Sequence, residues 1–214
     1  NDYTIEIIKS FESGFKEKGI SYKWQSEKDE GIYDAFNKGI NLASGNWVSF
    51  LGSDDVYLLN SLEKYYKTIL KSRNEVDICF SNIKIVGENK KDKVFDGKWK
   101  WNRFRRKMSF AHVGAFHNRS FFKKYGTYNI AYKIAGDYEL LLRANEKLRT
   151  LKLDELTVVM SDLGISNRKI MEVYKETTRA KIETGKVSFI LSKSDYFLWT
   201  LKHKIKKILH ALAR

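Results

Sequence analysis

The feature that most limits the fold is the alternation of helix-type and strand-type segments in the first part of the chain. Apolar residues follow a helical spacing over residues 31–44, and a short apolar run covers residues 47–51. Strand-type alternation returns over residues 76–86. Short apolar strands between amphipathic helices are typical of sheets covered by helices on both faces. The pattern therefore predicts an α/β sandwich with a mostly parallel sheet.

Three further elements follow from the same spacing. Residues 4–18 have one apolar helical face, which predicts a helix. Residues 20–25 have the composition of a short strand, so a strand is expected there. Asn60 and Glu63 have the spacing of a capping box, which predicts that a helix starts there and runs to about Lys71.

Length and composition narrow the class of protein. The 214 residues are 43% hydrophobic, which suits one domain with an appendage. Cys79 is the only cysteine, so an intrachain disulfide is impossible and a cytosolic protein is expected. The sequence has no run of ~20 apolar residues that would span a bilayer and no signal segment at its start. Because it opens on Asn1 in the middle of a loop-like segment, we expect the natural protein to begin earlier.

Positive charge is concentrated in two short stretches. Of the net charge of +14, residues 90–107 hold +7 and residues 195–214 hold +4. Two local basic surfaces indicate polyanionic partners, such as phosphates, acidic lipid or nucleic acid.

The second of these stretches has the pattern of a basic amphipathic helix. One helical face is apolar and basic side chains cover much of the other. The apolar residues are Leu198, Leu201, Ile205, Ile208 and Leu212, and the basic ones are Lys202, His203, Lys206, Lys207 and His210. Such a helix is typical of binding at a membrane surface. A terminal helix that docks on the core through its leucine stripe would have the same pattern, and both interpretations stay open.

The apolar run at residues 47–51 leads into an acidic turn, residues 52–55, with the sequence GSDD. In open α/β sheets, ligands bind beyond the carboxyl ends of the strands. Mg²⁺ binds through one or two carboxylates together with substrate phosphates, and it neutralises charge on a leaving diphosphate. Small residues in this turn let a ligand approach the backbone. A polar turn that enters a helix would have a similar composition.

The run SEKDEGIYDAFNKGI, residues 26–40, completes a longer pattern with this turn. Together they resemble the bacterial family 2 glycosyltransferases of the GT-A fold. Their pattern is Ser-Glu-x-Asp-x-Gly-Ile-Tyr-Asp-Ala-x-Asn-Lys-Gly-Ile, followed by a spacer and an apolar strand that ends in x-Asp-Asp. The resemblance implies a nucleotide-sugar transferase that uses Mn²⁺ or Mg²⁺, with Asp55 as the metal ligand. The residues that it implies for the donor site are Asp29, Gly31, Asn37, Ser53 and Asp54. For Asn37 and its neighbour Lys38, contacts on the helix surface are an equally good interpretation.

A second acidic cluster follows at Asp137, just before an apolar helical segment. A helix cap would explain an aspartate there. In the family that the chain resembles, this position holds the catalytic base, which deprotonates the acceptor hydroxyl in a single inverting displacement. Glu139 is the second candidate, and its spacing to Arg143 predicts a local ion pair.

The resemblance covers residues 1–170. His112, which precedes an aromatic strand, is a candidate for contact with the diphosphate or the acceptor, and a packing histidine is the alternative. We expect a GT-A domain over residues 1–170 that lacks the first strand, helix and strand of that fold. A helical extension is expected over residues 171–214, with membrane association as one of its two interpretations.

Cations and rings alternate in the segment KWKWNRFRRK, residues 98–107. Such a segment could bind single-stranded nucleic acid, anionic lipid or a lipid-linked diphosphate. In a GT-A fold it would lie near the acceptor, so Arg105 and Arg106 are candidates for binding the acceptor or the diphosphate. A solvated basic loop without a ligand remains the simple alternative.

These patterns favour an enzyme that transfers a sugar in bacterial surface polysaccharide assembly. The expected donor is a nucleotide sugar, with UDP favoured, and the expected acceptor is a glycan or a polyprenyl-diphosphate-linked molecule. We expect a cytoplasmic protein, peripheral on the inner face of the plasma membrane, that binds no nucleic acid. The alternatives are a catalytically inactive, membrane-associated partner of another transferase and a nucleic-acid-binding module.

Overall fold

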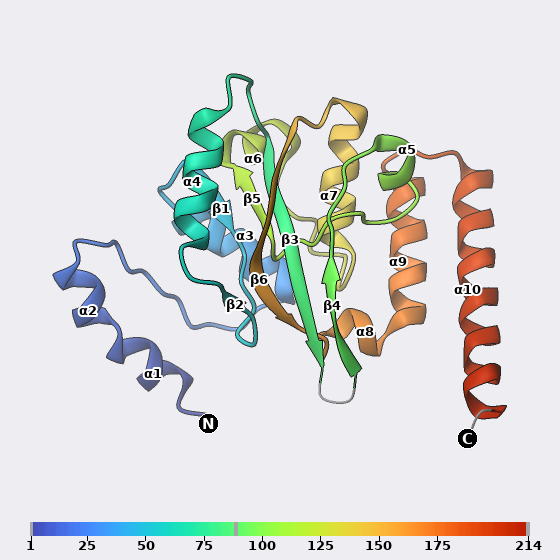
Figure 1. Ribbon diagram of the computed structural model, residues 1–214, viewed down its shortest axis with the longest axis horizontal. Coiled ribbons are helices and arrows are strands. Elements are labelled where there is room, and N and C mark those ends of the chain that lie inside the picture. The colour runs from blue at the N-terminus through green and yellow to red at the C-terminus, as the bar shows by residue number, and fades with distance from the viewer. Residues whose placement is uncertain (1, 88–89, 213–214) are drawn as a thin grey trace.

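A mixed β-sheet forms the centre of the molecule in the computed structural model, which describes residues 2–87 and 90–212 (Figure 1). The strand order is β1-β5-β3-β6-β2, and β4 pairs with the outer part of β3. The strands are β1 (Trp47–Ser49), β2 (Val56–Tyr57), β3 (Ile78–Gly87), β4 (Lys90–Phe95), β5 (Ala115–Asn118) and β6 (Thr150–Ser161).

Helices lie on both sides of this sheet, with α4 on one side and α7, α9 and α10 on the other (Figure 1). The first helices are α1 (Thr4–Ser10), α2 (Glu12–Glu17), α3 (Ile32–Leu42), α4 (Ser61–Lys71), α5 (Trp101–Phe104) and α6 (Arg119–Tyr125). The later ones are α7 (Gly136–Ala144), the 3-10 turn η1 (Asn145–Lys147), α8 (Ile165–Arg168), α9 (Ile170–Glu183) and α10 (Phe189–Leu212). None of the described helices is both long and apolar enough to cross a bilayer.

The α/β architecture is confirmed, but the expectation of a mostly parallel sheet is wrong for the described strands. β3 and β6 run parallel, with Ile78 opposite Thr150. The other described pairings, β1–β5, β2–β6, β3–β4 and β3–β5, are antiparallel. An apolar run reveals that a strand is buried, whereas its direction depends on the connections, which the run does not encode.

Several predicted elements form, with changes at their ends. The helix predicted over residues 31–44 is α3, and the strand over residues 47–51 is β1. α4 starts where predicted, but Asn60 has a φ of 61° and makes no side-chain cap, so the capping box is wrong. Residues 20–25 form no strand. Residues 4–18 form two short helices, α1 and α2, and neither buries a residue.

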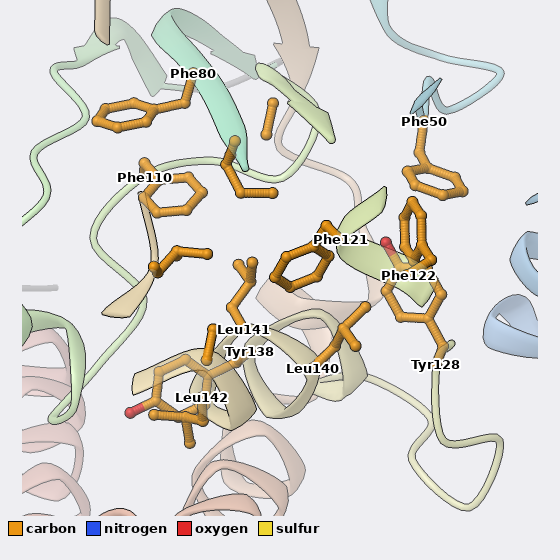
Figure 2. Close-up of a cluster of buried hydrophobic side chains, with 14 of the residues drawn as sticks. Phe50, Phe80, Phe110, Phe121, Phe122, Tyr128, Tyr138, Leu140, Leu141 and Leu142 are labelled. Atoms are coloured by element: carbon orange, nitrogen blue, oxygen red, sulfur yellow. The ribbon is translucent and has the colours of Figure 1, made fainter. Parts of the chain in front are cut away.

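The main core lies between the sheet and helices α3, α6 and α7. Successive residues of β3 point to opposite faces, so Ile78 and Phe80 enter this core while Cys79 packs on the α4 side. Figure 2 shows the leucines of α7 below a group of phenylalanines from several segments. The labelled members are Phe50, Phe80, Phe110, Phe121, Phe122, Tyr128, Tyr138, Leu140, Leu141 and Leu142.

A buried polar cluster holds α4 on the other face. The Tyr65 hydroxyl lies 2.7 Å from Ser81 Oγ and 3.0 Å from Thr157 Oγ1, and it donates to the Gly114 carbonyl at 2.8 Å. Because these partners come from β3, β6 and the segment before β5, one tyrosine fixes α4 against three parts of the sheet layer.

Candidate active site

The acidic turn after β1 is held in place by Asp55. Its Oδ1 accepts a hydrogen bond from the backbone N–H of Ser161 at 3.1 Å, and its Oδ2 accepts one from Gly52 at 3.3 Å. The first bond ties the turn to the end of β6, and the second closes the turn on itself. A Cβ at Gly52 would lie 2.7 Å from Asp55 Oδ2, so a side chain there would displace this carboxylate. Ser53 and Asp54 are exposed to solvent next to it.

The environment of Asp55 suits a partial metal site. Burial raises the pKa of Asp55, and the charge of Asp54 raises it further, against the two backbone hydrogen bonds. A bound cation would stabilise the charged carboxylate of Asp55 against burial and against the charge of Asp54. Each carboxylate oxygen accepts one backbone hydrogen bond and keeps a second lone pair that could bind the cation. No group of three or more potential metal ligands occurs among the residues that the structure describes. An ion at Asp55 would therefore need oxygens from a substrate, as Mg²⁺ often does.

Asp137 lies in the first turn of α7, where the helix dipole favours a carboxylate. It is not the N-cap of the helix, which was the alternative role for this position, because the N-cap residue is Ala135. Its Oδ1 accepts from the N–H of Tyr138 at 2.7 Å. The Tyr33 hydroxyl of α3 lies 3.4 Å from the same oxygen and donates to the Ile134 carbonyl at 2.7 Å. α3, which carries the glycosyltransferase-like pattern, thus contacts the second acidic cluster directly.

Three aromatic side chains join the two acidic segments. Phe50, which follows β1, stacks on the His112 ring at 5.1 Å, and His112 Nε2 lies 2.7 Å from the Tyr128 hydroxyl. Burial raises the pKa of Tyr128, and the nearby charge of Asp137 adds to the effect. The charge of Asp137 therefore acts on both members of the His112–Tyr128 pair.

The surroundings of His112 favour a packing role over a role in binding the diphosphate. Its ring packs against both Phe36 and Phe50, which also contact each other, and its Nε2 is engaged with Tyr128. Burial lowers the pKa of His112 although Asp137 opposes the shift, so the ring is neutral at pH 7. A neutral, partly enclosed imidazole offers no cation for a phosphate.

Asn37 also has a structural role that the donor-site expectation did not include. Its side-chain amide donates to the Tyr128 carbonyl at 2.9 Å, and its carbonyl oxygen accepts from the Tyr128 N–H at 2.9 Å. This two-bond contact fixes α3 to the loop that carries Tyr128. We therefore leave Asn37 out of the proposed donor site.

The loop before α3 is organised by Lys38. Its ammonium contacts the carboxylates of Glu27 at 2.6 Å, Asp29 at 2.7 Å and Asp34 at 3.1 Å. Gly31, at the start of the helix, has a φ of 131°, which favours glycine. Lys38 thus holds the partly exposed Asp29 in a fixed loop.

Glu176 of α9 is the site residue that sequence reasoning missed. Its carboxylate accepts three backbone N–H groups, from Lys133 at 2.9 Å, Ile134 at 2.8 Å and Ala135 at 2.8 Å. These residues form the segment that enters α7 immediately before Asp137. A single glutamate on an amphipathic helix carries no sequence signal for such a role.

Arg105 and Arg106 lie beside α7 but differ in their surroundings. The Tyr138 hydroxyl donates to the Phe104 carbonyl at 3.0 Å, which places α5 next to the residue after Asp137. Arg106 donates from Nε at 2.9 Å and from Nη2 at 2.5 Å to Asp195 of α10, so its guanidinium is largely used in the fold. Arg105 Nε is buried without a hydrogen-bond partner among the described residues.

The aromatic residues of the basic stretch pack inward. Trp99 lies 4.9 Å from the Phe104 ring, and Trp99 and Trp101 both pack against the main core. Rings in this position stabilise the fold of the stretch and are not free platforms for stacked bases.

Comparisons with known proteins identify the family of the chain. The model of the family described as glycosyl transferase family 2 matches residues 1–129. The PGL/p-HBAD biosynthesis glycosyltransferase of Mycobacterium bovis is 25% identical over 80% of this chain and 65% of its own length. An uncharacterized glycosyltransferase of Mycobacterium tuberculosis is 32% identical over 60% of this chain and 49% of its own length. The chain therefore spans less than two thirds of the length of these relatives.

Among solved structures, TarS 1-349 of S. aureus in complex with UDP superposes with a TM-score of 0.58 at 15% identity. The match covers 95% of this chain and 59% of that one. The same TarS segment in complex with UDP-GlcNAc gives the same TM-score. At this identity the likeness concerns the fold alone.

Proposed function

Because this chain belongs to glycosyl transferase family 2 and has the GT-A fold, we propose that it transfers a sugar by a single inverting displacement with Asp137 as the base. The contact between Asp137 and Tyr33 carries this proposal, since it joins the family pattern on α3 to the start of α7. The donor is a nucleoside diphosphate sugar, with UDP favoured because the TarS neighbour binds UDP and UDP-GlcNAc.

The chemistry assigns one role to each acidic segment. The acceptor oxygen forms a bond to the anomeric carbon as the bond from that carbon to the diphosphate breaks, and the hydroxyl proton passes to Asp137. Attack opposite the leaving group inverts the anomeric centre. Asp55 would hold a Mn²⁺ or Mg²⁺ ion, which would neutralise charge on the leaving diphosphate. Asp29, Gly31, Ser53 and Asp54 border the donor.

We propose a glycan or a polyprenyl-diphosphate-linked molecule as the acceptor, in surface polysaccharide assembly at the cytoplasmic side of the membrane. Arg105 supports an anionic acceptor, because its Nε is buried without a hydrogen-bond partner among the described residues and it follows Phe104, which Tyr138 of α7 contacts. The inward packing of Trp99 and Trp101 removes the main support for a nucleic-acid-binding module. A catalytically inactive partner remains the rival, and the following experiment separates the two.

The test is calorimetric titration of UDP-, GDP- and dTDP-sugars into the full-length protein, with Mn²⁺ or with a chelator. We expect one nucleotide class to bind only with the metal, and Asp55→Asn to abolish that binding. Asp154→Asn is the control, since it removes an exposed carboxylate from another part of the sheet. Asp137→Asn should keep donor binding and lose about 10²-fold to 10⁴-fold in transfer rate. A folded protein that binds none of these donors would exclude the active enzyme.

A further inference from the structure

The C-terminal helix α10 has two opposite faces, and one of them packs on α9. On that face, Asp195 pairs with the buried Lys181 ammonium at 2.8 Å, and the same ammonium lies 4.3 Å from the centre of the Trp199 ring. The His203 ring lies near Tyr174 of α9. Residues 192, 195, 199 and 203 follow a helical spacing, so they define one packing face.

The leucine stripe therefore does not dock α10 on the core. It lies on the other face of the helix, and Figure 1 shows α10 at the edge of the molecule, with α9 on its inner side. The exposed fraction of Leu201 is 43%, and that of Ile208 is 59%. The exposed apolar side chains of this stripe are Ile190, Phe197, Leu198, Leu201, Ile205, Ile208 and Leu209. The side chains of His210 and Leu212 lie outside the described residues.

Lysines border the stripe on both sides. With 3.6 residues per turn, Lys202 lies beside Leu198 and Ile205 along one edge. Lys193 and Lys204 lie along the other edge, and all three lysines are exposed. An apolar stripe bordered by lysines on both sides lets each ammonium remain at headgroup level while the apolar side chains enter the acyl boundary.

Charge decides between a membrane and a second copy of the chain. Asp195 is the only acidic residue in α10, and it is buried on the α9 face. A second copy would bring lysines against lysines around the stripe, with no exposed carboxylate on this helix to compensate them. Anionic headgroups complement the same lysines. The ion pair between Arg106 and Asp195 also holds the basic segment 98–107 beside the start of α10, which extends the positive surface.

We propose that α10 binds an anionic membrane surface, lying in the plane of the interface with its apolar stripe toward the acyl chains. The helix lies on the bilayer and does not cross it, in agreement with its composition. The proposal concerns lipid binding alone and does not depend on sugar transfer.

The test measures cosedimentation of the full-length protein with vesicles of phosphatidylcholine mixed with phosphatidylglycerol, compared with phosphatidylcholine alone. We expect binding to the anionic vesicles that weakens with added salt. Leu201→Glu/Ile205→Glu should lower vesicle partitioning by about tenfold or more. The matched control is Leu62→Glu/Leu70→Glu, which places the same charges at exposed leucines of α4 on the opposite side of the sheet.

A second pair of substitutions, Lys202→Gln/Lys204→Gln, keeps the apolar stripe and should lower binding to anionic vesicles by about fivefold for each lysine. Circular dichroism checks that the helices are retained. No binding by the natural protein would overturn the proposal, as would equal loss in the α10 and α4 variants. A dimer in light scattering that Leu201→Glu/Ile205→Glu converts to a monomer, without vesicle binding, would assign the stripe to self-association instead.

Discussion

Asp195 joins two cations from different segments, Lys181 of α9 and Arg106 of the basic stretch. Both Asp195 and Lys181 are fully buried. Asp195→Asn would leave the Lys181 ammonium buried without a counter-charge, and we expect a loss of about 3–5 kcal/mol in the free energy of unfolding. Urea denaturation at pH 7 measures this loss. Lys181→Met/Asp195→Leu removes both charges, and its free energy of unfolding should be much closer to that of the natural protein. Similar losses in the two variants would mean that the unpaired Lys181 charge is not the cause of the destabilisation.

The same carboxylate gives a pH dependence with a defined sign. Burial would raise the pKa of Asp195, but Arg106 and Lys181 overcome it and hold the pKa below its usual value. The stabilisation that the Asp195 carboxylate provides is therefore complete above the pKa of this carboxyl in the unfolded chain, which is about 4. It is lost as the pH falls through the lower pKa of the same group in the folded protein. We expect the stability difference between the natural protein and Asp195→Asn to shrink below about pH 4 in urea titrations. A difference that stays constant down to strongly acidic pH would contradict this.

Contacts of single residues could be predicted from the sequence where both partners are close together in the chain. The ion pair expected between Glu139 and Arg143 forms at 2.5 Å, because helix geometry alone brings residues four apart together. The packing roles of His112 and Asn37 depend on Tyr128, which is distant in the chain, so the sequence left their alternatives open. The assignments of Asp55 and Asp137 as metal ligand and base stay predictions that the substitutions above test.

At the scale of elements, α9 supports the entry into α7 through Glu176. Glu176→Gln keeps one acceptor oxygen for three N–H groups, so the segment before Asp137 should lose its fixed geometry. Misplacement of a reacting group by about 1 Å can cost 10²-fold, and we expect kcat to fall by roughly tenfold to 10²-fold. The KM for the donor should change little, because the donor residues lie on other elements. Steady-state kinetics measures the two constants separately.

Glu172→Gln is the matched control for this positioning role. Glu172 lies on the same helix, is exposed and pairs with Lys169 at 3.2 Å. Loss of the Glu172 charge should leave kcat unchanged. If Glu176→Gln raised the donor KM and left kcat intact, Glu176 would not act through Asp137.

The contact between α3 and α7 depends on Gly136. A Cβ there would lie 2.7 Å from the ring of Tyr33, whose hydroxyl is already engaged with Ile134. Gly136→Ala should therefore destabilise the protein by about 1–3 kcal/mol through overpacking. Gly39→Ala on the same α3 meets no atom within 4 Å, and we expect it to be neutral or stabilising by about 0.5–1 kcal/mol. Equal stability of Gly136→Ala and Gly39→Ala in thermal denaturation would disprove the close approach of Gly136 to the Tyr33 ring.

Elements with strong helical periodicity could be placed from the sequence, and strand partners could not. α4 forms at the predicted position even though Asn60 does not cap it, because Tyr65 anchors its apolar face. The strand expected at residues 20–25 is absent, since a strand requires a partner that local composition does not specify. The apolar stripe of α10 was recognised, but its outward direction follows from the Asp195–Lys181 pair on the opposite face.

At the scale of the whole molecule, burial is distributed very unevenly along the chain. β3 lies inside the sheet between β5 and β6, and Ile78, Phe80 and Ile83 are almost completely buried. α1 and α2 contain no buried residue and lie apart from the sheet (Figure 1). Their helical pattern predicted one helix over residues 4–18 where two short helices form, and it gave no information on whether their apolar face has a partner in the described structure.

This difference predicts a gradient in local stability that hydrogen exchange can measure. Amides inside β3 open only when most of the sheet opens, so they should exchange close to the rate of global unfolding. Amides of α1 and α2 need to break only local helical bonds, and short isolated helices are marginal in water, so they should exchange by orders of magnitude faster. Mass spectrometry of peptides from residues 4–17 and 78–83 compares the two directly. Equal protection of both segments would mean that the apolar face of α1 and α2 is covered in solution, and the exposed Ile7 and Phe11 would then mark the covered surface.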